Sequence, residues 1–120
     1  MIVKSLEHLN SLSKKVADQL IKNDCIFLIG EIGVGKTTFT RYLINYLQEK
    51  NGEKITEVLS PTFNLLYEYD LNNIKIIEWP QLINIPFIDK LEVYLDYAKN
   101  ENEREIKFIG SDKWKILNEL

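Results

Sequence analysis

The stretch Gly30-Glu31-Ile32-Gly33-Val34-Gly35-Lys36-Thr37-Thr38 decides the fold of this chain. It fits the pattern G-x-x-x-x-G-K-[ST]. The apolar run 25–29 precedes it, as expected for a buried strand, and residues 39–44 follow it at helical spacing. A strand, a glycine loop and a helix in this order are what a phosphate-binding loop requires. The sequence therefore predicts such a loop at residues 30–38.

The chemistry of this loop follows from its residue types. Glycine lets successive backbone N–H groups turn toward an anion, and the helix that begins near Lys36 points its positive end at the same place. We expect Lys36 to reach the β- and γ-phosphates of a nucleoside triphosphate, and the Thr37 hydroxyl to ligate Mg²⁺. The alternative is a glycine turn that caps an ordinary helix beside an exposed lysine. The residues expected to contact the nucleotide here are Glu31, Ile32, Gly33, Val34, Gly35, Lys36, Thr37 and Thr38.

Length and composition predict a single domain over residues 1–120. The chain is 45% hydrophobic, which is enough for one compact core and leaves no room for a second. Its 15 basic and 18 acidic residues give a net charge of −3, with no basic arm. This charge pattern does not favour nucleic-acid binding through electrostatics alone.

Cysteine usage and the N-terminus predict a cytoplasmic location. Cys25 is the only cysteine and lies in an apolar run, so we expect no disulfide framework and no disulfide-linked partner. The N-terminus shows no signal-peptide pattern, and no apolar run approaches the length of a membrane span. We therefore expect no membrane association.

Periodicity predicts an α/β fold in which a mixed sheet is flanked by helices. Ser5 is the expected N-cap of the first helix. The two C-terminal strands alternate with period two and are joined by a polar link, which predicts an antiparallel hairpin. The expected helices cover residues 5–22, about 36–50 and a short stretch from 112, and the expected strands cover 25–29, 64–71, 74–80, 91–97 and 105–109.

Two further segments carry polar groups that suit a phosphate site. In Ser60-Pro61-Thr62-Phe63 the hydroxyls can face a phosphate or a metal-bound water, although a capped turn entering a strand explains them equally well. In Ile77-Glu78-Trp79-Pro80 an apolar strand ends in a carboxylate. This pattern is common by itself. Its position after a phosphate-binding loop favours a carboxylate close to Mg²⁺.

With these segments in place, the chain resembles the bacterial TsaE (YjeE) family. The glycine loop, the Ser60–Phe63 and Ile77–Pro80 segments, and residues 91–97 followed by Arg104 occur in the family's order. The resemblance implies a small P-loop ATPase with ATP and Mg²⁺ as cofactors. It also implies TsaB and TsaD as partners in placing threonylcarbamoyl on the adenosine next to the anticodon of tRNA. TsaD would perform the transfer, while ATP binding and hydrolysis would reset the complex.

Position by position, the resemblance assigns roles within the site. Lys36, Thr62 and Glu78 would be catalytic, and Thr37 and Glu78 would hold the metal. Thr62 would lie toward the γ-phosphate. The residues implied as further nucleotide contacts are Trp79, Arg104 and Glu7.

One departure from the family pattern concerns hydrolysis. The family continues from a strand like Ile74-Lys75-Ile76 into an Asp-bearing segment and a helix before its Glu-Trp-Pro strand. Here Ile76 runs almost directly into Ile77-Glu78-Trp79, and Asp70 is a weak substitute for the missing Asp. Either one strand does two jobs in a trimmed sheet, or the topology differs locally. The sequence supports ATP binding better than ATP hydrolysis.

Two other functions compete with the ATPase. A nucleotide-dependent binding module would load ATP and hydrolyse little or none of it. A small-molecule kinase would close an arginine-bearing lid over the phosphoryl group, but the chain has only Arg41 and Arg104. No RNA-stacking module is visible in the sequence, so we expect contact with tRNA only through the complex.

Overall fold

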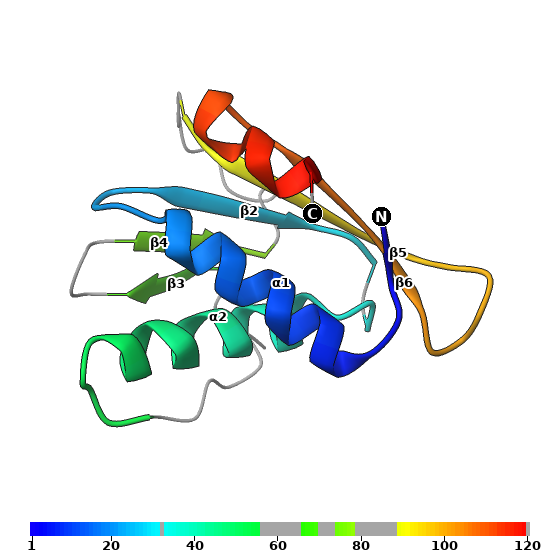
Figure 1. Cartoon of the computed structure of the whole chain (residues 1–120), viewed down its shortest axis with the longest axis horizontal. Coiled ribbons are helices and arrows are strands. Elements are labelled where there is room, and N and C mark those ends of the chain that lie inside the picture. The colour runs from blue at the N-terminus through cyan, green and yellow to red at the C-terminus, as the bar shows by residue number, and fades with distance from the viewer. Residues whose placement is uncertain (32, 56–65, 70–73, 79–88, 120) are drawn as a thin grey trace.

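The structure is a computed structural model that describes residues 1–31, 33–55, 66–69, 74–78 and 89–119, with the backbone alone for 66–69. Within these ranges the chain forms a six-stranded sheet with helices on one face (Figure 1). The elements are β1 (Ile2–Val3), α1 (Leu6–Gln19), β2 (Cys25–Ile29), α2 (Lys36–Lys50), β3 (Leu66–Tyr69), β4 (Ile74–Ile77), β5 (Leu91–Tyr97), β6 (Arg104–Ile109) and the 3-10 helix η3 (Asp112–Glu119).

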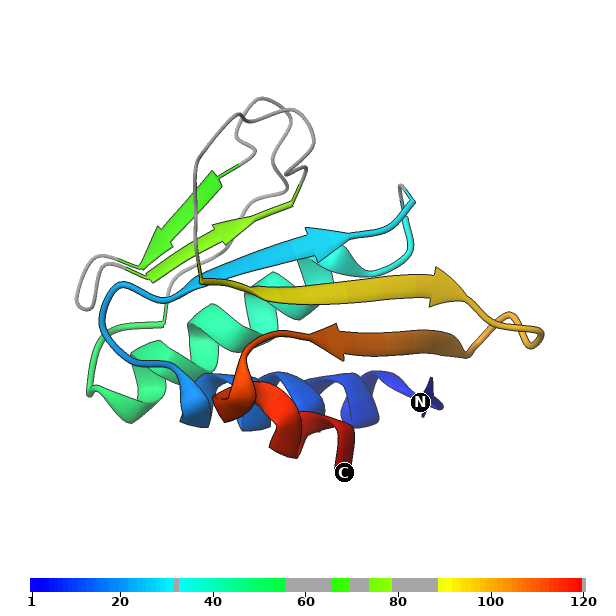
Figure 2. The same cartoon turned by 90° about the horizontal axis from the view of Figure 1, so that it is seen from above.

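The sheet is mixed, with the order β1-β6-β5-β2-β4-β3 (Figure 2). β2 is parallel to β5 on one side and to β4 on the other, while the β1–β6, β5–β6 and β3–β4 pairs are antiparallel. These pairings confirm the predicted mixed α/β fold and the C-terminal hairpin. Because the glycine loop follows the central strand, it lies at the sheet edge where open α/β folds bind their ligands.

β4 bears on the alternatives that the sequence left open for residues 74–80. It pairs antiparallel with β3, opposing Tyr69 to Ile74, and parallel with β2, where Phe27 lies opposite Ile77. One strand is therefore both the antiparallel partner of β3 and the strand that ends beside the phosphate loop. That the sheet is trimmed relative to the family stays a prediction.

One hydrophobic core joins the helices to the sheet. Val16 of α1, Phe39 of α2, Leu28 of β2 and Trp114 of η3 belong to the same buried cluster. No helix in the described ranges is long and apolar enough to cross a bilayer. The prediction of a single domain over residues 1–120 also concerns segments outside these ranges and stays a prediction.

Cys25 is a buried thiol at the first position of β2. It is 2% exposed, and burial raises its pKa to about 11, which the nearby Lys75 and Lys90 only partly offset. A protonated, inaccessible thiol is a poor nucleophile and a poor disulfide partner. Cys25 therefore acts as a small apolar side chain.

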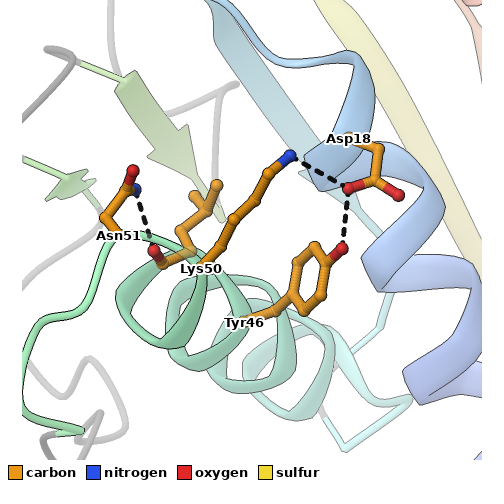
Figure 3. A network of polar contacts seen from close by, with 5 residues as sticks. Asp18, Tyr46, Lys50 and Asn51 are labelled. Carbon is orange, nitrogen blue, oxygen red and sulfur yellow. Dashed lines mark hydrogen bonds and ion pairs between the residues drawn. The ribbon is translucent and has the colours of Figure 1, made fainter.

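A polar network at the surface joins α2 to α1 (Figure 3). The Tyr46 hydroxyl donates to Asp18 Oδ1 at 2.7 Å, and Lys50 Nζ lies 3.2 Å from the same oxygen. The bond to Asp18 raises the pKa of Tyr46. At the end of α2, the Asn51 side-chain amide donates to the Leu47 carbonyl at 2.8 Å. Exposed ion pairs contribute little stability each, so the buried side chains that α1 and α2 share in the core hold the two helices together.

The first helix is shorter than the predicted range 5–22. Ser5 is its N-cap, as predicted, but α1 ends at Gln19. The reason is a local turn in which Asp24 Oδ2 accepts the Ile21 N–H at 2.7 Å. This side chain gives the backbone a hydrogen bond that competes with continuation of the helix.

Three other details differ from the prediction. β1 was not predicted, β6 begins one residue earlier than expected, and the final helix is a 3-10 helix. The N-terminal ammonium donates to the Ile106 carbonyl at 3.2 Å, which helps to hold β1 on the sheet edge. The predicted turn at 60–63 lies outside the described residues, as do the ends of the predicted strands at 64–65, 70–71 and 79–80.

Neighbouring residues of η3 test its packing. Leu117 is 1% exposed in the core and Ile116 is 49% exposed. We expect Leu117→Ala to lower the free energy of unfolding by about 2–5 kcal/mol, because it leaves a cavity under the sheet. Ile116→Ala should change it by about 0.5 kcal/mol or less. Urea unfolding of both variants measures the difference, and equal losses would contradict this placement of η3.

Candidate nucleotide-binding site

The loop between β2 and α2 has a backbone that depends on its glycines. Gly33 has φ 80° and Gly35 has φ 123°, values that other residues rarely adopt. At Gly30 the constraint is space, because a Cβ there would collide with the carbonyl oxygen of Leu95. The loop therefore packs directly against the backbone of β5.

Lys36 is a buried cation at the start of α2. Its side chain is 4% exposed, and Nζ donates to the carbonyl of Gly30 at the other end of the loop. Burial lowers the pKa of the Lys36 ammonium, and the negative charge of Glu78 opposes that shift. An anion held in the loop would compensate this cation further, since opposite charges stabilise one another strongly where water is excluded.

Glu78 brings a carboxylate to the same place from the end of β4. It is 2% exposed, and the Thr37 hydroxyl donates to its Oε1 at 3.1 Å, with Oε2 at 3.4 Å. The two residues are 41 positions apart in sequence and meet because β4 lies beside β2. A hydroxyl and a carboxylate side by side are oxygen donors of the kind that Mg²⁺ prefers.

A hollow of about 270 Å³ opens beside the loop. Residues 33–35 of the loop and Thr38 of α2 form its floor. Its walls contain apolar residues from β1 and α1, and polar residues from the β5–β6 connection and the start of β6: Val3, Leu6, Leu9, Glu101, Asn102 and Arg104. A hollow with an apolar wall, a polar wall and a phosphate loop at its floor has the right chemistry for a base and a ribose.

Some of the residues predicted to contact the nucleotide line the hollow, and others lie away from it. Thr38 lines the hollow. Glu31 is exposed at the start of the loop, and its carbonyl accepts the Val34 N–H at 3.3 Å. Arg104 lies on the hollow's wall, where its Nε donates to the Val34 carbonyl at 3.1 Å. Glu7 is exposed on the first turn of α1 and does not line the hollow. Each predicted contact with the nucleotide stays a prediction.

Three predicted site residues lie outside the described residues. They are Ile32, Thr62 and Trp79. Among the described residues, no group of three or more His, Cys, Asp or Glu side chains could hold a metal by itself. Phosphate and water oxygens usually complete the coordination of Mg²⁺ at sites that offer it one or two protein ligands.

Sequence reasoning missed part of the hollow. Leu6 has the spacing of the helix's apolar stripe, yet it is 65% exposed and lines the hollow. The signal was available, because Leu6 directly follows the N-cap and precedes the buried stripe that begins at Leu9. Glu101 and Asn102 were read only as a polar link, and nothing local to them indicates that the hairpin reaches the loop.

The family model described as Threonylcarbamoyl adenosine biosynthesis protein TsaE matches residues 3–76 of this chain. The chain belongs to the TsaE family. The match begins within β1, covers the glycine loop and α2, and ends inside β4 at Ile76, two residues before Glu78.

Curated TsaE proteins have related sequences. The tRNA threonylcarbamoyladenosine biosynthesis protein TsaE of Rickettsia conorii is 40% identical over 75 residues, which cover 62% of this chain and 41% of the relative. That of Aquifex aeolicus is 36% identical over 92 residues, covering 77% and 66% respectively. The chain thus spans less than half of the Rickettsia conorii relative and about two thirds of the Aquifex aeolicus one.

A solved structure has the same fold. The crystal structure of Bacillus subtilus YdiB superposes with a TM-score of 0.74 over 99% of this chain and 90% of that one, at 24% identity. At this identity the likeness concerns the fold alone.

Removal of the Lys36 charge tests the phosphate site. We expect Lys36→Ala to weaken ATP binding by about 100-fold or more, since a charge-assisted contact contributes up to about 3 kcal/mol. Lys50→Ala, in the exposed last turn of the same helix, is the matched control and should bind like the wild type. Titration calorimetry measures both, and unchanged affinity in Lys36→Ala would refute the site.

Neutralisation of Glu78 tests the metal side. We expect Mg²⁺ to increase ATP affinity in the wild type, and Glu78→Gln to reduce that increase by about tenfold or more, because an amide is a poor Mg²⁺ ligand. Without Mg²⁺ the variant should bind ATP at least as tightly as the wild type, since a negative charge near the phosphates is gone.

The control for this metal test is Glu105→Gln, which removes an exposed carboxylate from β6. It should respond to Mg²⁺ as the wild type does. A Glu78→Gln protein with the full Mg²⁺ effect would remove Glu78 from the metal side.

Proposed function

We propose that this TsaE chain binds ATP with Mg²⁺ and acts in threonylcarbamoyladenosine modification of tRNA. The observation that carries the proposal is the meeting of three buried or half-buried groups at the glycine loop. They are the Lys36 ammonium, the Thr37 hydroxyl and the Glu78 carboxylate, with Thr37 Oγ1 3.1 Å from Glu78 Oε1. Family membership supports the pathway.

Each group has its own part in binding. The backbone N–H groups at the start of α2 and the helix dipole would bind the β-phosphate. Lys36 would leave the Gly30 carbonyl and bridge the β- and γ-phosphates. This exchange is favourable because the phosphate charges stabilise a cation that burial destabilises.

Thr37 and Glu78 fit a magnesium ion. Their oxygens are already in contact, and the carboxylate is shielded from water. The ion, when bound, would neutralise charge on the phosphate oxygens. Thr37 would contribute its hydroxyl oxygen and Glu78 a carboxylate oxygen, directly or through water. Attraction between such an ion and this carboxylate would offset the cost of burying Glu78 at the end of an apolar strand.

The hollow would take the base and ribose. Leu6 and Leu9 offer apolar contact to a flat ring, and Asn102 offers hydrogen bonds to its edge. Exposure of Leu6 is explained by this role, since an apolar side chain at the mouth of a hollow is available to a ligand. Arg104 and Glu7 remain predicted contacts of the nucleotide.

Hydrolysis would be slow in the isolated chain. The reaction, ATP and water to ADP and phosphate, needs an oriented water as well as bound phosphates. The family's Asp for this task is missing from the sequence, and Thr62 is the predicted alternative on the γ-phosphate side. This lack favours the second candidate, a nucleotide-dependent binding module that hydrolyses little or no ATP.

TsaB-like and TsaD-like proteins are the proposed partners, in the cytoplasm, with tRNA reached only through the complex. The relatives' names support this pathway, and the net charge of −3 gives the chain itself no electrostatic preference for RNA. In this role ATP binding and hydrolysis would reset the complex between rounds of transfer.

An assay of the assembled complex tests the proposal. We expect slow ATP hydrolysis by the chain alone and an increase of about tenfold or more when TsaB and TsaD are added, since a partner can position the water. Lys36→Ala should show no increase, whereas Lys50→Ala should behave as the wild type. Binding of ATP and partners without any hydrolysis would favour the binding module, and phosphorylation of a metabolite would favour a kinase.

A further inference from the structure

The β5–β6 hairpin touches the glycine loop at three places along its length. The Leu95 backbone lies against Gly30. The Tyr97 hydroxyl lies close to Gly33, and a Cβ added to Gly33 would be 3.2 Å from the hydroxyl oxygen. Arg104 Nε donates to the Val34 carbonyl at 3.1 Å, across 70 residues of sequence. The hairpin is thus packed along the loop.

Arg104 is held from several sides. Its Nη1 donates to the carbonyls of Glu101 at 2.7 Å and of Glu103 at 2.8 Å. Its guanidinium carbon lies 4.7 Å from the centre of the Tyr97 ring, and Tyr97 is the cross-strand partner of Arg104 in the hairpin. A planar guanidinium can stack on a ring and donate in its own plane at the same time, which an ammonium cannot do.

The bond to Val34 fixes the direction of the next amide. The peptide between Val34 and Gly35 is trans, so its C=O and N–H point in opposite directions. With the Val34 oxygen held toward Arg104, the Gly35 N–H points away from the hairpin. Within the described part of the chain this N–H donates no hydrogen bond. Gly35 has φ 123° and would otherwise have wide conformational freedom.

We propose that Arg104 is a positioning residue, which, braced by Tyr97, holds the Val34–Gly35 peptide so that the Gly35 N–H is directed at the phosphates. This inference rests on the proposed triphosphate site. Arg104 acts through the loop backbone, so its effect is on any ligand with a chain of phosphates, whatever base the ligand carries. A direct contact with base or ribose would instead act on nucleotides alone.

The test compares ATP with inorganic tripolyphosphate by calorimetry on the full chain. We expect Arg104→Gln and Tyr97→Leu to weaken the binding of both ligands by the same factor, about tenfold or more. The reason is that the Gly35 N–H would no longer be directed at the charged phosphates. The Arg104→Lys variant should also bind both ligands weakly. Lysine keeps the positive charge but lacks the planar guanidinium that donates to the Val34 carbonyl and stacks on Tyr97. Lys107→Gln, an exposed cation on the same strand, should bind both ligands as the wild type does.

Other outcomes overturn the inference in distinguishable ways. Loss of ATP binding with unchanged tripolyphosphate binding would mean a contact with base or ribose. Restored binding in Arg104→Lys, together with normal binding in Tyr97→Leu, would mean that Arg104 acts directly by its charge. A wild type that binds neither ligand would refute the proposed function itself. If Tyr97→Leu fails to fold, Tyr97→Phe with Arg104→Lys carries the test, and wild-type binding in both would overturn the inference.

Discussion

The parallel pairing of β2 with both β4 and β5 is the constraint on which the rest of the structure depends. It places the carboxyl ends of three strands side by side, and each end brings a different part of the site. β2 leads into the glycine loop, β4 ends at Glu78, and β5 passes under Gly30 and leads to Tyr97. Without β4 the loop would lose the Glu78 carboxylate beside Thr37. Without β5 it would lose the Leu95 backbone against which Gly30 packs.

The loop itself could be predicted because its signal is local. Gly33, Gly35 and Lys36 are close in sequence, and the strand and helix around them have clear periodicity. The predicted start and end of α2 agree with the observed helix, Lys36–Lys50. Burial of Lys36 follows from this local arrangement, whereas the hydrogen bond between Thr37 and Glu78 depends on which strand lies beside β2.

The remaining features depend on long-range pairing or on very short signals. A two-residue strand such as Ile2–Val3 has no periodicity to detect, and the contact of Arg104 with Val34 spans 70 residues. The early end of α1 at Gln19 depends on a single side-chain bond from Asp24, which helix propensity does not include. Family resemblance identified Arg104 as a residue of interest, but the geometry was needed to connect it with the loop backbone.

The proposed site separates two properties that P-loop proteins usually combine. Phosphate binding would need the loop, Lys36 and the metal side, which are brought together by β2, α2 and β4. Hydrolysis would need an oriented water as well, and the sequence lacks the Asp-bearing segment that the family resemblance implies. We therefore propose that the chain holds ATP until a partner completes the site.

Backbone NMR of the ¹⁵N-labelled chain during an ATP titration, with and without Mg²⁺, tests the central claim most directly. We expect saturable shifts that are largest at the amides of Gly33, Gly35 and Lys36, with the Glu78 amide responding strongly only when Mg²⁺ is present. Loop amides that stay unchanged while residues elsewhere shift would contradict it.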